Sequence, residues 1–253
     1  MMKHRRDRYY WRAKKEGYRS RAAYKLKQLN QRYGLIGVSD VVVDLGAAPG
    51  GWLQVAREFS GGLVIGVDLV NIQPIEGVLT LRGDIRREDV VEKLLSATGG
   101  GVDVVLCDAA PNLSGNWSYD HARSIDLSTA AFRCAEDLLR GGGNFVVKVF
   151  QGDLFNDFYR RVKREFATTR IYSPPASRKQ SAEVYIVGKC RLSVPFQIDD
   201  LFDVVIEGIG TSGDGIVRID GFVVFVRGVE KDERVKIKIS AINPRFAFAK
   251  VIG

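Results

Sequence analysis

The sequence predicts an α/β fold, in which a mainly parallel, doubly wound sheet is followed by a small all-β barrel. As far as residue 192, apolar runs typical of buried strands alternate with segments of helical periodicity. One of these runs leads into a glycine-rich loop, as at the nucleotide-binding corner of a doubly wound sheet. Beyond residue 193 only short β-rich runs occur, separated by Gly, Asp and Asn. We therefore expect two domains, residues 1–192 and 193–253.

The elements are expected in the following order. Helical spacing of apolar residues predicts a helix over 20–33, which contains Lys25. Buried strands are expected to end at Asp44 and to cover 63–68, 78–81, 102–108, 145–150, 170–172 and 182–189, with a helix over 127–139. Five short strands are expected near 204–206, 216–219, 222–226, 235–239 and 246–251.

The glycine-rich loop lies within residues 41–52, VVVDLGAAPGGW. It differs from a dinucleotide fingerprint because Ala48 replaces the second required glycine and Pro49 stiffens the turn. It is not a P-loop either, since no Gly-Lys-Ser/Thr follows. A nucleoside ligand without phosphates fits better, and S-adenosyl-L-methionine is the obvious candidate. The alternative is an ordinary tight turn between a strand and a helix.

Composition limits the classes of function. The chain has 253 residues, 45% of them hydrophobic, and no apolar run long enough to span a bilayer. The charged N-terminus lacks the apolar stretch of a secretory signal. Cys107, Cys134 and Cys190 have neither metal-ligand nor disulfide spacing. We expect a cytoplasmic protein with no membrane partner and no metal site. Its net charge of +8 favours a polyanionic partner, with nucleic acid as the leading candidate.

The first 27 residues form a basic segment that also contains five aromatic residues. Cations contact phosphates and aromatic rings stack on bases, so this segment could hold single-stranded or looped RNA. A solvated basic arm is the alternative reading. The aromatic residues are Tyr9, Tyr10, Trp11, Tyr18 and Tyr24.

Acidic residues follow the predicted strands. Asp44, Asp68, Asp84 and Asp108 lie at or just past strand ends, where ligands of open α/β sheets bind. We expect them to converge on one crevice. Asp68 would bind the ribose hydroxyls of a nucleoside, Asp84 the adenine amino group, and Asp108 would lie near a sulfonium. Each alone could instead be a helix cap or a turn residue.

Lys148 interrupts an otherwise apolar strand, FVVKVF. Lysine is almost never fully buried without a partner, so its amine is expected to reach the crevice. Glu183 opens a similarly apolar strand. The alternative is that both are charges on edge strands.

Together these motifs resemble the FtsJ/RrmJ (RlmE) family, S-adenosylmethionine-dependent RNA ribose 2′-O-methyltransferases with a Rossmann-like sheet. The resemblance covers about residues 8–192. It rests on DLGAAPGGW from Asp44, RSRAAYKL from Arg19, DAAPN from Asp108, VVKVF, and SRKQSAEVY from Ser177. It implies a catalytic tetrad of Lys25, Asp108, Lys148 and Glu183. It further implies cofactor contacts at Gly50, Trp52, Asp68, Asp84 and Asp108.

The tail resembles a TRAM domain, a small RNA-binding barrel, through GDGI from Gly213, GFVVFV from Gly221 and FAFA from Phe246. The family's bacterial ribosomal RNA enzymes lack such a tail. The resemblance of residues 8–192 to the FtsJ/RrmJ family implies 2′-O-methylation of a uridine in large-subunit (23S) ribosomal RNA. This uridine lies in the loop that receives aminoacyl-tRNA. Lys148 would be the base. Methylation of tRNA or another RNA, and a non-catalytic RNA-binding factor in ribosome assembly, remain the alternatives.

Overall fold

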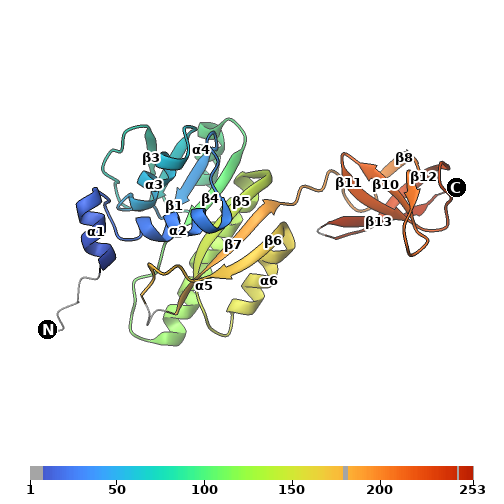
Figure 1. The fold of residues 1–253 in the computed structure, drawn as a ribbon. Helices are drawn as coiled ribbons and strands as arrows, with labels where there is room; N and C mark the ends of the chain where they lie inside the picture. Colours follow the sequence, from blue (N-terminus) through green and yellow to red (C-terminus); the bar gives the residue numbers. More distant parts are fainter. Residues whose placement is uncertain (1–7, 179–181, 244, 253) are drawn as a thin grey trace. The chain divides into compact units, whose positions relative to one another are not determined.

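The computed structural model describes residues 8–178, 182–243 and 245–252. The chain divides into two compact units, Met1–Arg191 and Leu192–Gly253. In Figure 1 the first unit runs from blue to light orange and the second from orange to red. Each unit has its own hydrophobic core, and each is described by itself.

A seven-stranded sheet forms the centre of the first unit, in the order β3-β2-β1-β4-β5-β7-β6 (Figure 1). Strands β1 to β5 pair in parallel, whereas β7 runs antiparallel to both of its neighbours, β5 and β6. The strands are β1 (Val42–Leu45), β2 (Val64–Asp68), β3 (Val78–Arg82), β4 (Val102–Cys107), β5 (Leu139–Phe150), β6 (Phe166–Tyr172) and β7 (Glu183–Arg191).

Helices cover both faces of this sheet. Val42 and Val64 pack in the layer of α2 and α3, while Val43 and Ile65 pack in the layer of α4, α5 and α6. Successive strand side chains point to opposite faces, so a sheet covered on both sides needs continuous apolar runs. The helices are α1 (Arg8–Glu16), α2 (Ala23–Tyr33), α3 (Gly51–Phe59), α4 (Glu88–Thr98), α5 (Trp117–Leu138) and α6 (Phe155–Glu165).

The second unit is a six-stranded sheet in the order β8-β12-β13-β11-β10-β9. Inward side chains such as Val224, Ile237 and Ala249 form its core, and the residues between them point outward. The strands are β8 (Leu201–Val205), β9 (Gly208–Ile209), β10 (Gly215–Ile219), β11 (Phe222–Val226), β12 (Arg234–Ile242) and β13 (Phe246–Val251).

The predicted fold class is confirmed, and the differences from prediction concern individual elements. Helix α5 begins at Trp117, ten residues before the expected start at 127. The prediction missed this start because the first turns of the helix are largely polar and lack apolar periodicity. The Asn116 side chain caps it by accepting a hydrogen bond from the Tyr119 N–H at 3.2 Å. Helices α1, α4 and α6 and the two-residue strand β9 were not among the elements predicted by range. None of the described helices has the length and apolar character needed to cross a membrane.

Candidate active site

The loops after β1 and β4 meet at the carboxyl edge of the sheet. Gly46 has a φ of +73°, and a Cβ at this position would lie 2.4 Å from the Cβ of Ala109. The backbone N–H groups of Gly46 and Ala47 donate to the Val67 carbonyl at 2.8 and 3.0 Å. A side chain at position 46 would force the two loops apart, which explains why glycine is present.

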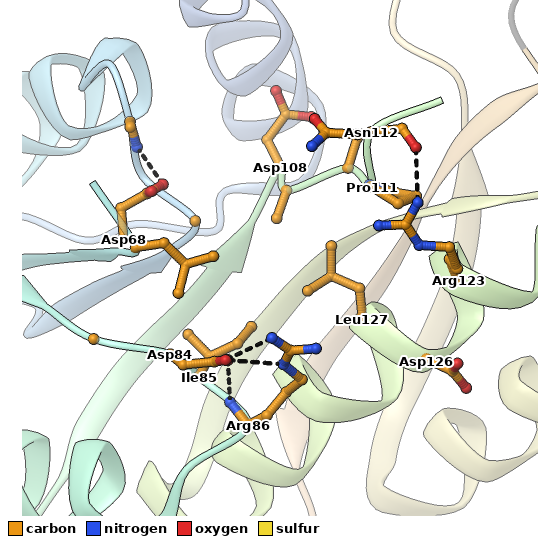
Figure 2. A pocket seen from close by; sticks show the side chains of 16 residues that line it. Asp68, Asp84, Ile85, Arg86, Asp108, Pro111, Asn112, Arg123, Asp126 and Leu127 are labelled. Carbon is orange, nitrogen blue, oxygen red and sulfur yellow. Dashed lines mark hydrogen bonds and ion pairs between the residues drawn. The ribbon is translucent and has the colours of Figure 1, made fainter. Parts of the chain in front are cut away.

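Together with α5, these loops line a cavity of about 440 Å³ (Figure 2). This volume lies in the range typical of small-molecule sites. Asp68 at the end of β2, Asp84 after β3 and Asp108 after β4 all line the cavity, and Leu127 of α5 faces them. Three of the four acids expected at this crevice are therefore brought together.

Asp68 and Asp84, on the cavity wall, are held by hydrogen bonds from neighbouring residues. Asp68 accepts hydrogen bonds from the N–H groups of Ala48 at 2.9 Å and Val70 at 3.1 Å. Asp84 accepts from the Arg86 guanidinium at 2.6 to 3.1 Å. The hydrogen bonds from Arg86 hold the pKa of Asp84 below its usual range. Both side chains are therefore fixed hydrogen-bond acceptors at the cavity wall.

The fourth acid, Asp44, is not where the sequence indicated. It lies inside β1, one residue before its end, and is only 1% exposed. It is absent from the residues that line the cavity. Both carboxylate oxygens are buried without a hydrogen-bond partner among the described residues. Burial, with smaller contributions from the charges of Asp108 and Asp68, raises the pKa of Asp44 well above its usual value.

This electrostatic arrangement fits a cationic ligand. A positive charge in the cavity would interact favourably with Asp68 and Asp108, and it would favour the charged form of the buried Asp44. S-adenosylmethionine carries positive charges on its sulfonium and its amino group. The residues present therefore fit the ligand expected from the loop.

Beside the cavity lies a group of five side chains, which we call the lysine–carboxylate cluster: Lys25, Asp108, Lys148, Glu183 and Tyr185. The Lys148 Nζ donates to the backbone carbonyl of Asp108 at 2.5 Å and lies 3.2 Å from its Oδ1. The Lys25 Nζ lies 3.7 Å from that Oδ1 and 3.6 Å from Glu183 Oε2. The four expected tetrad residues are therefore joined through Lys25 and Asp108.

Tyr185 is the member that the predicted site lacked. Its hydroxyl donates to Asp108 Oδ1 at 2.5 Å and accepts from the Lys25 Nζ at 2.9 Å. Burial, and then the charge of Asp108, raises the pKa of Tyr185 well above 10, so the phenol stays protonated. The signal was present in the sequence, because Tyr185 is two residues after Glu183 and lies on the same face of β7.

Gly50 and Trp52 lie where α3 begins and are not among the residues that line the cavity. The Trp52 indole N–H donates to the Ala22 carbonyl at 2.8 Å, and its ring packs 5.8 Å from that of Tyr185. Trp52 thus connects the glycine-rich loop to the lysine–carboxylate cluster.

The aromatic residues of the basic N-terminal segment differ in accessibility. Tyr24 is 3% exposed and packs against Tyr9 and Tyr18, with ring centroids 5.5 and 5.7 Å away. Tyr24 is therefore part of the protein core and is not available to stack on a base. Trp11 on α1, by contrast, is 53% exposed.

The loop that follows Asp108 is tied to the first turn of α5. The Asp120 carboxylate accepts from the Ser114 N–H and hydroxyl, each at 2.8 Å, and from the Gly115 N–H at 3.1 Å. The hydrogen bond from the Ser114 backbone is the main reason that the pKa of Asp120 lies below its usual range. Arg123 also donates to the Asn112 carbonyl at 3.0 Å (Figure 2). The wall of the cavity is thus held by charged side chains of the helix.

A doubly wound sheet with an antiparallel β7, together with an acidic cavity at the carboxyl strand ends, defines a Rossmann-like methyltransferase. Comparison with known proteins agrees. The family model described as FtsJ-like methyltransferase matches residues 18–191, and the TRAM domain model matches residues 200–252. The chain belongs to the FtsJ-like methyltransferase family and carries a C-terminal TRAM domain.

Relatives match over the full length. A Methanosarcina barkeri protein named ribosomal RNA large subunit methyltransferase E is 60% identical, covering 99% of this chain and 96% of the relative. A protein of the same name from Methanothrix thermoacetophila is 56% identical, covering 100% and 99%. Among solved structures, a Plasmodium falciparum protein described as a ribosomal RNA methyltransferase is 30% identical, with a TM-score of 0.63. The match covers 70% of this chain and 100% of that one.

Proposed function

We propose that the protein transfers the methyl group of S-adenosylmethionine to the 2′-hydroxyl of a ribose in large-subunit (23S) ribosomal RNA. The proposed target is a uridine in the loop that receives aminoacyl-tRNA. The names of the full-length relatives support ribosomal RNA as the substrate class. The ribose and uridine specificity follow from the resemblance of the sequence motifs to the RNA ribose methyltransferases.

The observation that carries this proposal is the position of Lys148 beside the cavity. The Lys148 side chain is 7% exposed, and its amine contacts both the backbone and the carboxylate of Asp108, which itself lines the cavity. A hydroxyl that entered beside Asp108 would therefore meet an oriented amine. Binding RNA alone does not require two buried lysines around one carboxylate, so this arrangement favours catalysis.

In the proposed reaction a ribose 2′-hydroxyl attacks the methyl group in line. S-adenosylmethionine, when bound, supplies an activated methyl group on a sulfonium that is already a good leaving group. Most of the acceleration would therefore come from positioning. Lys148 Nζ would accept the hydroxyl proton as general base. Asp108 and the Tyr185 hydroxyl would hold Lys148 and Lys25 in place, and Glu183 would balance the charge of Lys25.

The cofactor would lie along the acidic wall of the cavity. Asp68, whose carboxylate is oriented by the N–H groups of Ala48 and Val70, would accept from the ribose hydroxyls. Asp84 would accept from the adenine amino group, and Asp108 would lie near the methyl group. Gly50 and Trp52 would supply further cofactor contacts.

The basic N-terminal segment and the exposed basic residues of β12 would both add RNA affinity. Net charge is +8, and Arg234 and Lys236 of β12 are exposed. Cations that contact phosphates bind any RNA and give strongly salt-dependent affinity. We propose that the N-terminal segment and the C-terminal unit hold the RNA, while the lysine–carboxylate cluster modifies it.

Free thiols at Cys107, Cys134 and Cys190 support a reducing compartment such as the cytoplasm.

The direct test is to incubate the protein with radiolabelled S-adenosylmethionine and separate pools of large-subunit ribosomal RNA, tRNA and messenger RNA. We expect label in the large-subunit RNA, resistant to alkali at one ribose, and none with Lys148→Ala. Label in tRNA alone would show that tRNA, and not ribosomal RNA, is the substrate. Absence of label from every pool, with cofactor bound, would favour a non-catalytic role in ribosome assembly.

In cells, 2′-O-methylation of ribosomal RNA from a deletion strain would be mapped at each nucleotide. Loss of the methyl group at the proposed uridine, restored by the parent gene but not by Lys148→Ala, is expected. Retention of that methyl group would exclude the assignment of this nucleotide.

A further inference from the structure

An exposed tryptophan stands at the start of α5. Trp117 is 52% exposed, and its ring lies nearly parallel to those of Phe150 and His121. The centroid distances are 6.0 and 6.4 Å, with interplanar angles of 14° and 16°. Phe150 and His121 are each 5% exposed. Trp117 therefore covers two buried rings while leaving half of its own surface in solvent.

The backbone that carries Trp117 is held in place. Asn116 caps the helix, and the Asp120 carboxylate binds the loop at Ser114 and Gly115. His121, one of the rings beneath the indole, accepts from the Leu154 N–H at 3.2 Å through its Nε2. An aromatic side chain fixed in this way loses little conformational entropy when a ligand binds to it.

This ring is close to the proposed catalytic residues. Phe150 follows Lys148 by two residues, so both side chains lie on the same face of β5, about 6.6 Å apart along the strand. In the pairing of β5 with β7, Phe150 is directly opposite Glu183, and Lys148 is opposite Tyr185. Trp117, stacked on Phe150, therefore stands at the edge of the lysine–carboxylate cluster.

We infer that Trp117 is a stacking platform for an unpaired RNA base next to the ribose that is methylated. This inference rests on the proposed function. Sequence-specific recognition of RNA uses unpaired bases stacked on aromatic rings. A half-exposed indole that packs on Phe150, two residues from the proton-accepting Lys148, meets that requirement. Each stacked base contributes about five- to hundredfold in affinity.

The first experiment uses intrinsic fluorescence, in a Trp11→Phe variant that retains the buried Trp52 and the exposed Trp117. An oligouridylate is compared with an abasic oligomer of the same length and charge. We expect the oligouridylate alone to quench the emission of Trp117, with no comparable quenching in the Trp11→Phe/Trp117→Phe variant. Equal quenching by both oligomers would overturn the inference. Because this measurement needs no methyl transfer, it separates the inference from the proposed reaction.

The second experiment uses steady-state kinetics on large-subunit ribosomal RNA. We expect Trp117→Leu to raise the KM for RNA about five- to hundredfold, with kcat at saturating RNA within about threefold of the parent. Trp117→Phe should restore most of the affinity, because it retains an aromatic ring. Cofactor affinity, measured by calorimetry, and the melting temperature serve as checks of folding.

Tyr119→Leu is the matched control. Tyr119 is 56% exposed on the same helix, but two residues further on it points about 200° away from Trp117. We expect its KM to stay within about twofold of the parent. An equal loss in Tyr119→Leu and Trp117→Leu, or an unchanged KM in Trp117→Leu, would show that base stacking on Trp117 is absent.

Discussion

In the lysine–carboxylate cluster, Lys25 and Lys148 are 8% and 7% exposed, and both amines lie within 4 Å of Asp108. On β12 of the C-terminal unit, by contrast, Arg234 and Lys236 point into solvent, on either side of a buried valine. Both regions are rich in positive charge, but only the first has removed it from water and surrounded it with fixed acceptors.

The difference separates two uses of a lysine. A buried amine held by a carboxylate has a defined position, so a small displacement should affect chemistry strongly. An exposed amine interacts with phosphates through a screened field, and its exact position matters little. Substitutions in the cluster should therefore change the rate, whereas substitutions on β12 should change affinity and its dependence on salt.

The largest effect is expected from Lys148→Arg. Arginine keeps the positive charge but does not give up its proton in the accessible pH range. If Lys148 is the base, both Lys148→Arg and Lys148→Ala should lose about 10²- to 10⁴-fold in the single-turnover rate. Cofactor and RNA binding should stay near normal.

Since arginine is also bulkier, the pH profile of the parent enzyme is the control for this substitution. A base that must be neutral predicts a single-turnover rate that rises with pH and then levels off. A flat profile, together with an active Lys148→Arg variant, would leave Lys148 as a positioning charge only.

The next effect concerns the cavity. We expect Asp68→Ala to weaken S-adenosylmethionine binding about ten- to hundredfold in calorimetry, because a charged acceptor for the ribose hydroxyls is removed. Asp89→Ala is the matched control, since Asp89 lies on α4 in ion pairs with Arg87 and Lys93. If Asp68→Ala binds as tightly as the control, the ribose contact lies elsewhere.

A smaller effect, about tenfold in rate, is expected from Tyr185→Phe, which removes the hydroxyl between Lys25 and Asp108. The raised pKa of Tyr185, caused by burial and then by Asp108, keeps the phenol protonated below pH 10. Tyr185 therefore contributes no ionisation to the pH profile in that range. The single-turnover profile of Tyr185→Phe should be lower than that of the parent but equal in shape. If the rate of Tyr185→Phe no longer rose at alkaline pH, Tyr185 and not Lys148 would be the group that accepts the proton.

The smallest effect is expected on the exposed face of β12. Each lost phosphate contact lowers the steepness of log K against log salt by about 0.7 to 0.9. Lys236→Ala should show a change of about this size in RNA binding and leave kcat unaltered. Lys93→Ala on α4 should leave the slope as in the parent. Identical slopes for both variants would exclude Lys236 from the RNA interface.

Much of the site could be predicted because parallel strands end at one edge of a sheet. That rule located Asp68, Asp84 and Asp108 without knowledge of the structure. It was wrong for Asp44, because β1 continues to Leu45 and leaves the carboxylate inside the strand. A shift of one residue decides between a cavity wall and a buried core, and apolar periodicity does not resolve strand ends to one residue.

Other features depend on contacts that no local pattern encodes. The direction of β7 is invisible in an apolar run, yet it decides which residues stand opposite Lys148. Helix α1 has a single buried residue, Ala13, so it lacks an apolar stripe. Trp117 was missed as a candidate because the polar start of α5 was not expected to be helical.

The position of β7 has a consequence for the newly made chain. The residues that line the cavity all lie between Gly46 and Leu127, so that wall can form early in synthesis. Strand β7 is the last strand of the sheet to be made, and it inserts between β5 and β6. Glu183 and Tyr185 meet Lys25 and Asp108 only at that moment. The cavity proposed to bind the methyl donor can thus be complete before the lysine–carboxylate cluster is assembled.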